Sequence, residues 1–258
     1  MKKKKQRMLN CLLILFFIAA TVCGLLIWSD HKGSAAADAA IDEAQDLKPP
    51  ADDGLMDFSG LRSENPDVVA WLTIPGTVID YPVAQAADND YYLHRDIQKT
   101  SNKNGALFLD CRVRADFSGF NNVVYGHHMK SGRMFQNLVQ FKDKAFFDRR
   151  TSGILHTPGK TWRLEFFAVA VTCQNSEWYE YAFASIGEKE AHIQKIKNSA
   201  MHYRDIGLAT DDRLVVLSTC SYEHEGARTV VAARLEDYLK EPSSHLAQIC
   251  VALRPNTE

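Results

Sequence analysis

Seven short apolar runs, rich in β-branched and aromatic residues, recur between residues 71 and 238. They lie at 71–76, 78–84, 105–110, 122–126, 161–173, 213–220 and 228–238. Each run is bounded by turn-forming or polar residues, which is typical of strands. The run at 161–173 alternates between two unlike faces, clearly so in its first half, as a strand with one face in the core does. We therefore predict a mostly β domain, either a barrel or a sandwich.

Two segments depart from this pattern and predict peripheral helices. In the segment 187–203, Ile193, Ile196 and Ala200 recur at helical spacing among charged residues, which predicts a helix lying over the sheet. In the segment 57–74, Ser63 or Asn65 is a candidate helix cap, with Pro66 in the first helical turn. We expect such short helices to cover one edge of the domain.

The N-terminus predicts a membrane anchor. The segment 1–7 carries five positive charges, and the following stretch from Met8 to Trp28 has no charge and is long enough to cross a bilayer as a helix. We predict a cytoplasmic basic tail and single-pass transmembrane helix over 1–30, a linker or stalk over 31–50, and an extracellular domain over 51–258. The alternative is a cleaved secretory signal, with the small residues at 33–40 as the cleavage region.

Composition excludes several classes of function. Lys and Arg total 30 against 32 Asp and Glu, a net charge of −2, so no basic excess points to nucleic acid as a partner. The six cysteines include no CxxC or CxxH pair, which argues against a structural zinc site or a redox motif. We therefore expect neither a metal nor a cofactor.

The runs at 213–220 and 228–238 suggest a reactive thiol. A short polar segment joins them, so antiparallel pairing places Arg228 across the ladder from Cys220. Thiolate is the reactive form of cysteine, and a nearby cation raises its fraction. A planar, permanently charged guanidinium also suits the oxyanion that forms when sulfur attacks a carbonyl.

A histidine is the expected acid and base for such a thiol. The run at 122–126 ends at Tyr125 and Gly126, and His127 and His128 follow in a loop where reactive groups are commonly presented. His224 is a competitor because it is close to Cys220 in sequence. The residues alone leave a plain alternative open, in which the cysteine is buried in the core and the histidine belongs to a turn.

Three segments resemble the sortase family. The segment "VLSTCSYEHEGAR" is similar to the strand end and downstream arginine of sortases, and the segments "VVYGHHMKSGRMF" and 65–96 are similar to class B sortases, together spanning about residues 58–235. The resemblance implies a closed β-barrel with N-terminal helices and one helix before the cysteine strand. It implies His127 as acid and base, Cys220 as nucleophile and Arg228 as the oxyanion-stabilising residue. It also implies substrate contacts from Asn89, Leu93, Tyr125, Ser218 and Thr219.

The same resemblance implies a membrane-anchored transpeptidase of the Gram-positive cell surface. Such an enzyme cleaves the C-terminal sorting signal of a surface protein after Thr and passes the acyl group, through a thioester, to an amine of a peptidoglycan precursor or a protein. The aromatic stretch 177–183 either walls the substrate groove or caps the core. The alternatives are a hydrolytic cysteine peptidase, an L,D-transpeptidase, whose Ser-x-Gly-Cys signature is absent because Thr219 precedes the cysteine, and a non-catalytic wall-binding β-domain.

Overall fold

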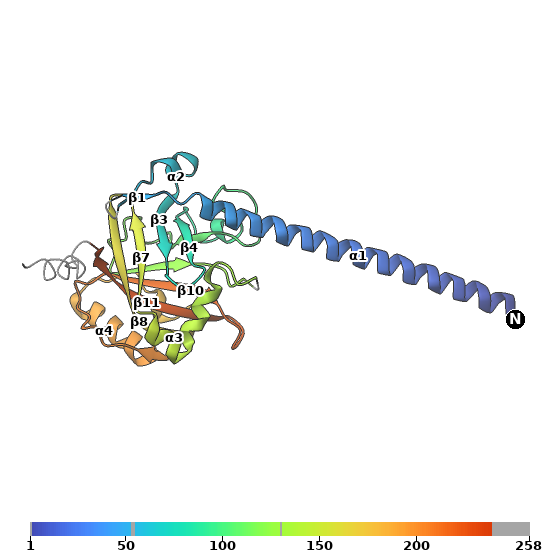
Figure 1. Ribbon diagram of the computed structural model, residues 1–258. Coiled ribbons are helices and arrows are strands. Elements are labelled where there is room, and N and C mark those ends of the chain that lie inside the picture. Colours follow the sequence, from blue (N-terminus) through green and yellow to red (C-terminus); the bar gives the residue numbers. More distant parts are fainter. Residues whose placement is uncertain (1, 53–54, 130, 239–258) are drawn as a thin grey trace, which may run out of the picture. The chain divides into compact units, whose positions relative to one another are not determined.

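The computed structural model describes residues 2–52, 55–129 and 131–238. The chain divides into two compact units, residues 1–43 and 44–258 (Figure 1). Helix α1 (Lys2–Asp46) runs without a break through the predicted anchor and into the predicted linker. Within the described residues, no helix combines the length and apolarity that crossing a membrane requires.

The second unit is built from short strands with a few helices between them. After α1 its helices are α2 (Ser59–Glu64), α3 (Lys144–Arg149) and α4 (Ile186–Ser199), with 3-10 turns η1 (Tyr91–Leu93), η2 (Phe135–Lys142) and η3 (Glu177–Tyr179). The strands are β1 (Ala51–Asp52), β2 (Leu55–Met56), β3 (Val68–Thr73), β4 (Asp80–Ala84), β5 (Leu107–Leu109), β6 (Asn121–Tyr125), β7 (Ser152–Thr157), β8 (Lys160–Cys173), β9 (His202–Tyr203), β10 (Leu214–Cys220) and β11 (Ala227–Asp237).

Eight of the described strands close into a barrel. Their order is β11-β10-β6-β5-β4-β3-β7-β8, and pairing between β8 and β11 completes the circuit. The β10–β6 and β4–β5 pairs are parallel, and the other neighbours are antiparallel. Figure 1 shows β8, β10 and β11 crossing the body of the domain with α3 and α4 beside them. The predicted closed β-barrel with peripheral helices is confirmed.

Helix α4 explains why β8 loses its two-faced pattern in its second half. The predicted helix before the cysteine strand is confirmed, and its buried Ile193 and Ile196 share an apolar cluster with Phe167 of β8. Ser185 caps its first turn by accepting a hydrogen bond from the Glu188 amide. Because the helix covers the outer face of the barrel here, both faces of the strand are apolar.

The prediction of a helix that begins near Pro66 is wrong. The helix of this region, α2, lies upstream, and Asn65 is its C-cap rather than an N-cap. A proline disfavours helical backbone in the residue before it, which here is Asn65, so α2 ends at Glu64. Val68 and its β-branched neighbour Val69 then enter β3, which is held between β4 and β7.

The burial of His192 predicts acid sensitivity of the fold. This α4 side chain is fully buried, with the rings of Phe120 and Phe183 against it and its Nδ1 3.5 Å from Glu180 Oε2. Burial lowers the pKa of His192, against the opposing charge of Glu180. The unfolded chain then binds the proton more readily, so this contribution to stability is complete above about pH 6.5 and declines as the pH falls toward the lowered folded pKa.

We expect His192→Leu to flatten the pH dependence of the free energy of unfolding below about pH 6.5. Denaturant unfolding at several pH values measures this, with His224→Leu, in an exposed loop, as the matched control. Burial also lowers the pKa of His156, so the free energy of unfolding of the His192 variant still depends on pH to some extent. An unchanged pH dependence in His192→Leu contradicts the assignment.

Candidate active site

The hairpin of β10 and β11 brings Cys220 and Arg228 together. Cys220 is the last residue of β10, and its partner in the ladder is Arg228. The Ser221 amide donates to the Ala227 carbonyl at 3.0 Å and closes the ladder at the loop. Both side chains are half-buried. The cross-strand placement predicted from the sequence is therefore confirmed.

A parallel pairing brings His127 to the same end of the barrel. β6 and β10 run in the same direction, with Tyr125 opposite Ser218. The chain leaves β6 through Gly126, whose amide donates to the Ser218 carbonyl at 3.1 Å. A Cβ on Gly126 would lie 2.4 Å from Leu107, so a side chain here has no room. The loop residue that follows, His127, is thus fixed beside the end of the cysteine strand.

These residues enclose a pocket of about 210 Å³. The three predicted catalytic residues line it, and so do all five predicted substrate contacts. The full lining consists of Asn89, Leu93, Phe108, Tyr125, Gly126, His127, Gln174, Tyr179, Ser218, Thr219, Cys220 and Arg228. The sequence prediction omitted Phe108 and Gln174, for which no local motif gives a signal. Tyr179 comes from the aromatic stretch 177–183, which both walls the pocket and, through buried Trp178, caps the core.

The histidines near Cys220 have different surroundings. The ring of His127 donates from Nε2 to the Leu93 carbonyl at 2.9 Å, which leaves Nδ1 as the acceptor of the neutral ring. His128 does not line the pocket, and its Nδ1 donates to the Cys220 carbonyl at 2.8 Å. His224 is exposed in the hairpin loop. Of these three histidines, His127 is the one that lines the pocket together with the Cys220 thiol.

Internal hydrogen bonds hold the hydroxyl groups of the pocket wall. Thr219 Oγ1 donates to the Gly126 carbonyl at 2.8 Å and so joins the cysteine strand to the histidine loop. The Ser218 hydroxyl is 2.9 Å from the hydroxyl of Tyr179. Burial raises the pKa of Tyr179 to about 12, so its phenol stays protonated at neutral pH. Both Ser218 and Thr219 are buried, and their hydroxyls form hydrogen bonds with other residues of the pocket lining.

A buried carboxylate holds two other residues of the pocket lining, Asn89 and Tyr125. Asp110 is fully buried and accepts a hydrogen bond from Tyr125 at 2.9 Å and two from Arg112, at 2.8 and 2.6 Å. Burial opposes its ionisation, but hydrogen bonds from Arg112, Asn89 and Tyr125 outweigh that effect and hold the pKa of Asp110 below its usual value. Asn89 also accepts from the Cys111 amide at 2.8 Å. Two predicted substrate contacts, Asn89 and Tyr125, are thereby fixed in place by one charge.

The pocket carries the elements of acyl transfer through sulfur. A thiol, an imidazole and a guanidinium share a small cavity at a barrel end, together with neutral phenols. Cys111, Cys173 and Cys220 are free thiols. Among the described residues, no group of His, Cys, Asp and Glu has the arrangement of a metal site.

The chain matches known proteins over this same domain. Residues 72–236 match the model of the sortase domain family. Sortase B of Listeria monocytogenes is 34% identical over 177 residues, which cover 68% of this chain and 72% of the relative. The X-ray structure of Clostridium perfringens sortase B is 33% identical with a TM-score of 0.67, covering 70% of this chain and all of that one. Sortase B of Bacillus anthracis is 31% identical with a TM-score of 0.73, covering 80% and 99%.

These matches agree in family, class and architecture. They confirm the predicted resemblance to class B sortases, and they come from a family of enzymes, not from binding domains. The chain therefore belongs to the sortase family, as a class B sortase and a cysteine transpeptidase.

Proposed function

We propose that this enzyme cleaves a C-terminal sorting signal after Thr and transfers the acyl group to an amine, with Cys220, His127 and Arg228 as its catalytic residues. The observation that carries the proposal is that these three side chains, from the β10–β11 hairpin and from the loop after β6, line one pocket. Sulfur, imidazole and guanidinium are the groups that a thioester mechanism needs around one carbonyl. The substrates are sorting-signal-bearing surface proteins.

In the first half-reaction, the Cys220 thiolate attacks the carbonyl carbon of the Thr residue in the sorting signal, and a C–S bond forms. Arg228 holds the negative charge that develops on the carbonyl oxygen. The C–N bond then breaks as the protonated ring of His127 donates its proton to the departing amine. The products are a thioester on Cys220 and the released C-terminal fragment.

In the second half-reaction, an amine replaces the sulfur. The now neutral ring of His127 takes a proton from the incoming amine, which attacks the thioester and expels the thiolate. The acceptor is an amine of a peptidoglycan precursor or of a protein. A solved sortase B, 25% identical to this chain, is complexed with triglycine, and so triglycine is a suitable trial acceptor.

Substitution of the nucleophile and of the guanidinium tests these roles. Cys220→Ala should abolish cleavage, while Arg228→Lys should lose about 100-fold or more in kcat because an ammonium lacks the planar fork. Candidate sorting pentapeptides with triglycine are the substrates, and mass spectrometry detects the thioester at Cys220. Arg114→Lys is the matched control, because Arg114 is an exposed residue that pairs with Asp116. Full activity in either site variant removes that residue from the mechanism.

The adjacent histidines separate proton transfer from positioning. His127→Ala should lose both half-reactions, about 100-fold or more in kcat. His128→Ala removes a hydrogen bond to the Cys220 carbonyl, so we expect a smaller loss and an unaltered pH profile. His224→Ala should be fully active. Steady-state kinetics between about pH 5 and 9 measure all three variants, and a greater loss in His128→Ala reverses the assignment.

Thiol labelling tests the pocket without a substrate. With Cys23 and Cys173 both replaced by Ser, since both are exposed, Cys220 should react with a methanethiosulfonate reagent much faster than Cys111. Burial, and then the charge of Asp110, raises the pKa of the Cys111 thiol, which makes Cys111 the internal reference. Equal rates for Cys111 and Cys220 contradict an activated nucleophile.

We propose further that the catalytic domain lies outside the cell, tethered at the membrane through its N-terminal segment. Support comes from the sequence, in which the basic segment 1–7 precedes the uncharged stretch from Met8 to Trp28. Protease treatment of intact cells should degrade the domain, as it does a surface protein, while a cytoplasmic control survives. Protection of the domain until the cells are lysed contradicts this location.

A further inference from the structure

A second pocket lies at the opposite mouth of the barrel. Its volume is about 470 Å³, and its lining includes Arg62 of α2, Lys160 and Trp162 at the start of β8, and Arg213 just before β10. Trp162 pairs with Asp237, at the far end of β11 from Arg228. At about 3.3 Å per residue, the length of β11 separates this pocket from the catalytic pocket by about 30 Å.

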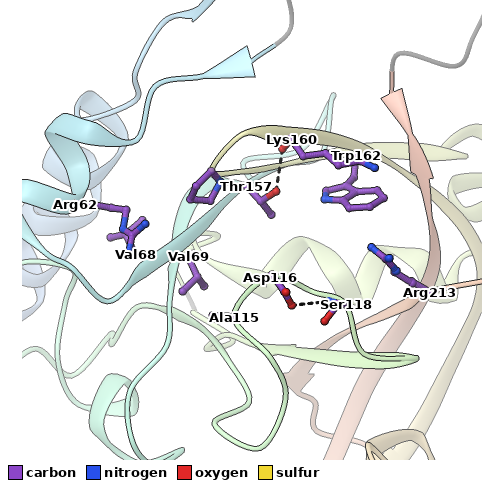
Figure 2. Close-up of a pocket in the computed structure, with 11 residues that line it drawn as sticks. Arg62, Val68, Val69, Ala115, Asp116, Ser118, Thr157, Lys160, Trp162 and Arg213 are labelled. Carbon is purple, nitrogen blue, oxygen red and sulfur yellow. Dashed lines mark hydrogen bonds between the residues drawn. The ribbon is translucent and has the colours of Figure 1, made fainter.

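The pocket wall is positively charged. Among the described residues, Arg62 and Arg213 have no carboxylate partner, and Lys160 pairs with Asp237 at 3.0 Å. The one acidic residue in the wall, Asp116, is already engaged by Arg114 at 3.3 Å and by the Ser118 amide at 3.0 Å. Figure 2 shows Arg62 and Arg213 approaching the hollow from opposite sides. The field in the pocket therefore favours an anion.

Trp162 adds a donor with no acceptor. Its side chain is 7% exposed, and its Nε1 has no hydrogen-bond partner. The other buried indoles of the domain do have partners, because Trp71 donates to Asp80 at 2.7 Å and Trp178 donates to Ser199 at 3.0 Å. Lys160 and Arg213 lie over the Trp162 ring, at 3.8 and 5.3 Å from its centroid. In Figure 2 the indole stands between these two cations at the edge of the hollow. Buried donors normally find an acceptor, and here the pocket is where one fits.

We propose that this pocket binds a small phosphate ester. Trp162 Nε1 and the Arg213 guanidinium donate to the phosphate oxygens, while Arg62 and Lys160 supply further positive charge. A phosphate monoester carries close to two negative charges at neutral pH, which matches several cations better than a single carboxylate does. The hollow is larger than the phosphate group alone and leaves room for the polar part of the ester. The proposal is independent of the transpeptidase reaction.

Indole NMR of the full-length chain labelled with 15N-tryptophan tests this site directly. The Trp162 resonance is identified as the one that disappears in Trp162→Phe. At constant ionic strength, inorganic phosphate and glycerol 3-phosphate should shift it saturably, while the resonances of Trp71 and Trp178 stay in place. Glycerol, acetate and sodium chloride should leave it unmoved. A stationary Trp162 resonance, or an equal shift with chloride, overturns the site, and equal affinity for acetate overturns the assignment to phosphate.

Charge variants give a second measurement that does not need the indole. Calorimetric titration with glycerol 3-phosphate should show affinity reduced about tenfold or more in Arg213→Gln, since one charge-assisted hydrogen bond is lost. Lys144→Gln, whose partner Asp148 lies on α3, is the matched control and should bind as the parent does. Unchanged affinity in Arg213→Gln overturns the proposal, whatever the catalytic activity of the variant.

Discussion

The parallel pairing of β6 with β10 is the constraint on which the candidate active site depends. Parallel strands end at the same edge of a sheet, so the loop that leaves β6 and the last residue of β10 must meet. The antiparallel return of β11 then adds Arg228 to the same edge. The side chains of His127, Cys220 and Arg228 therefore converge because of backbone register.

Hydrogen bonds make this convergence rigid. The Thr219 hydroxyl joins the cysteine strand to Gly126, and His128 binds the Cys220 carbonyl from outside the pocket. The charge of Asp110 is balanced by Arg112 and fixes Tyr125, which also lines the pocket. A buried charge that is paired in this way is costly to disturb, so the walls of the pocket resist movement. Preorganised groups of this kind stabilise a transition state without reorganising during the reaction.

Sequence patterns predicted seven of the eight barrel strands and the cysteine hairpin because their signals are local, but they did not predict β7 (Ser152–Thr157). The β-branched runs predicted these strands, and the short polar loop predicted the register of Cys220 against Arg228. The placement of His127 in the pocket depends on a parallel pair that no local pattern specifies, and here the family resemblance supplied the answer. Gln174 and Asp110 stayed hidden because their roles arise from contacts between distant segments. The helix predicted near Pro66 failed since the valines that follow it suit a helix face and a strand alike.

Closure of the barrel by β8 and β11 leaves little free sheet edge in the described part of the domain. The strand outside the circuit, β9, has two residues, and the β1–β2 ladder is equally short. A peptide therefore has no long row of unpaired amides and carbonyls on which to add itself as a further strand. Its recognition must come from the side chains and loops at the rim. Selectivity can then diverge through loop changes while the barrel that supports it stays the same.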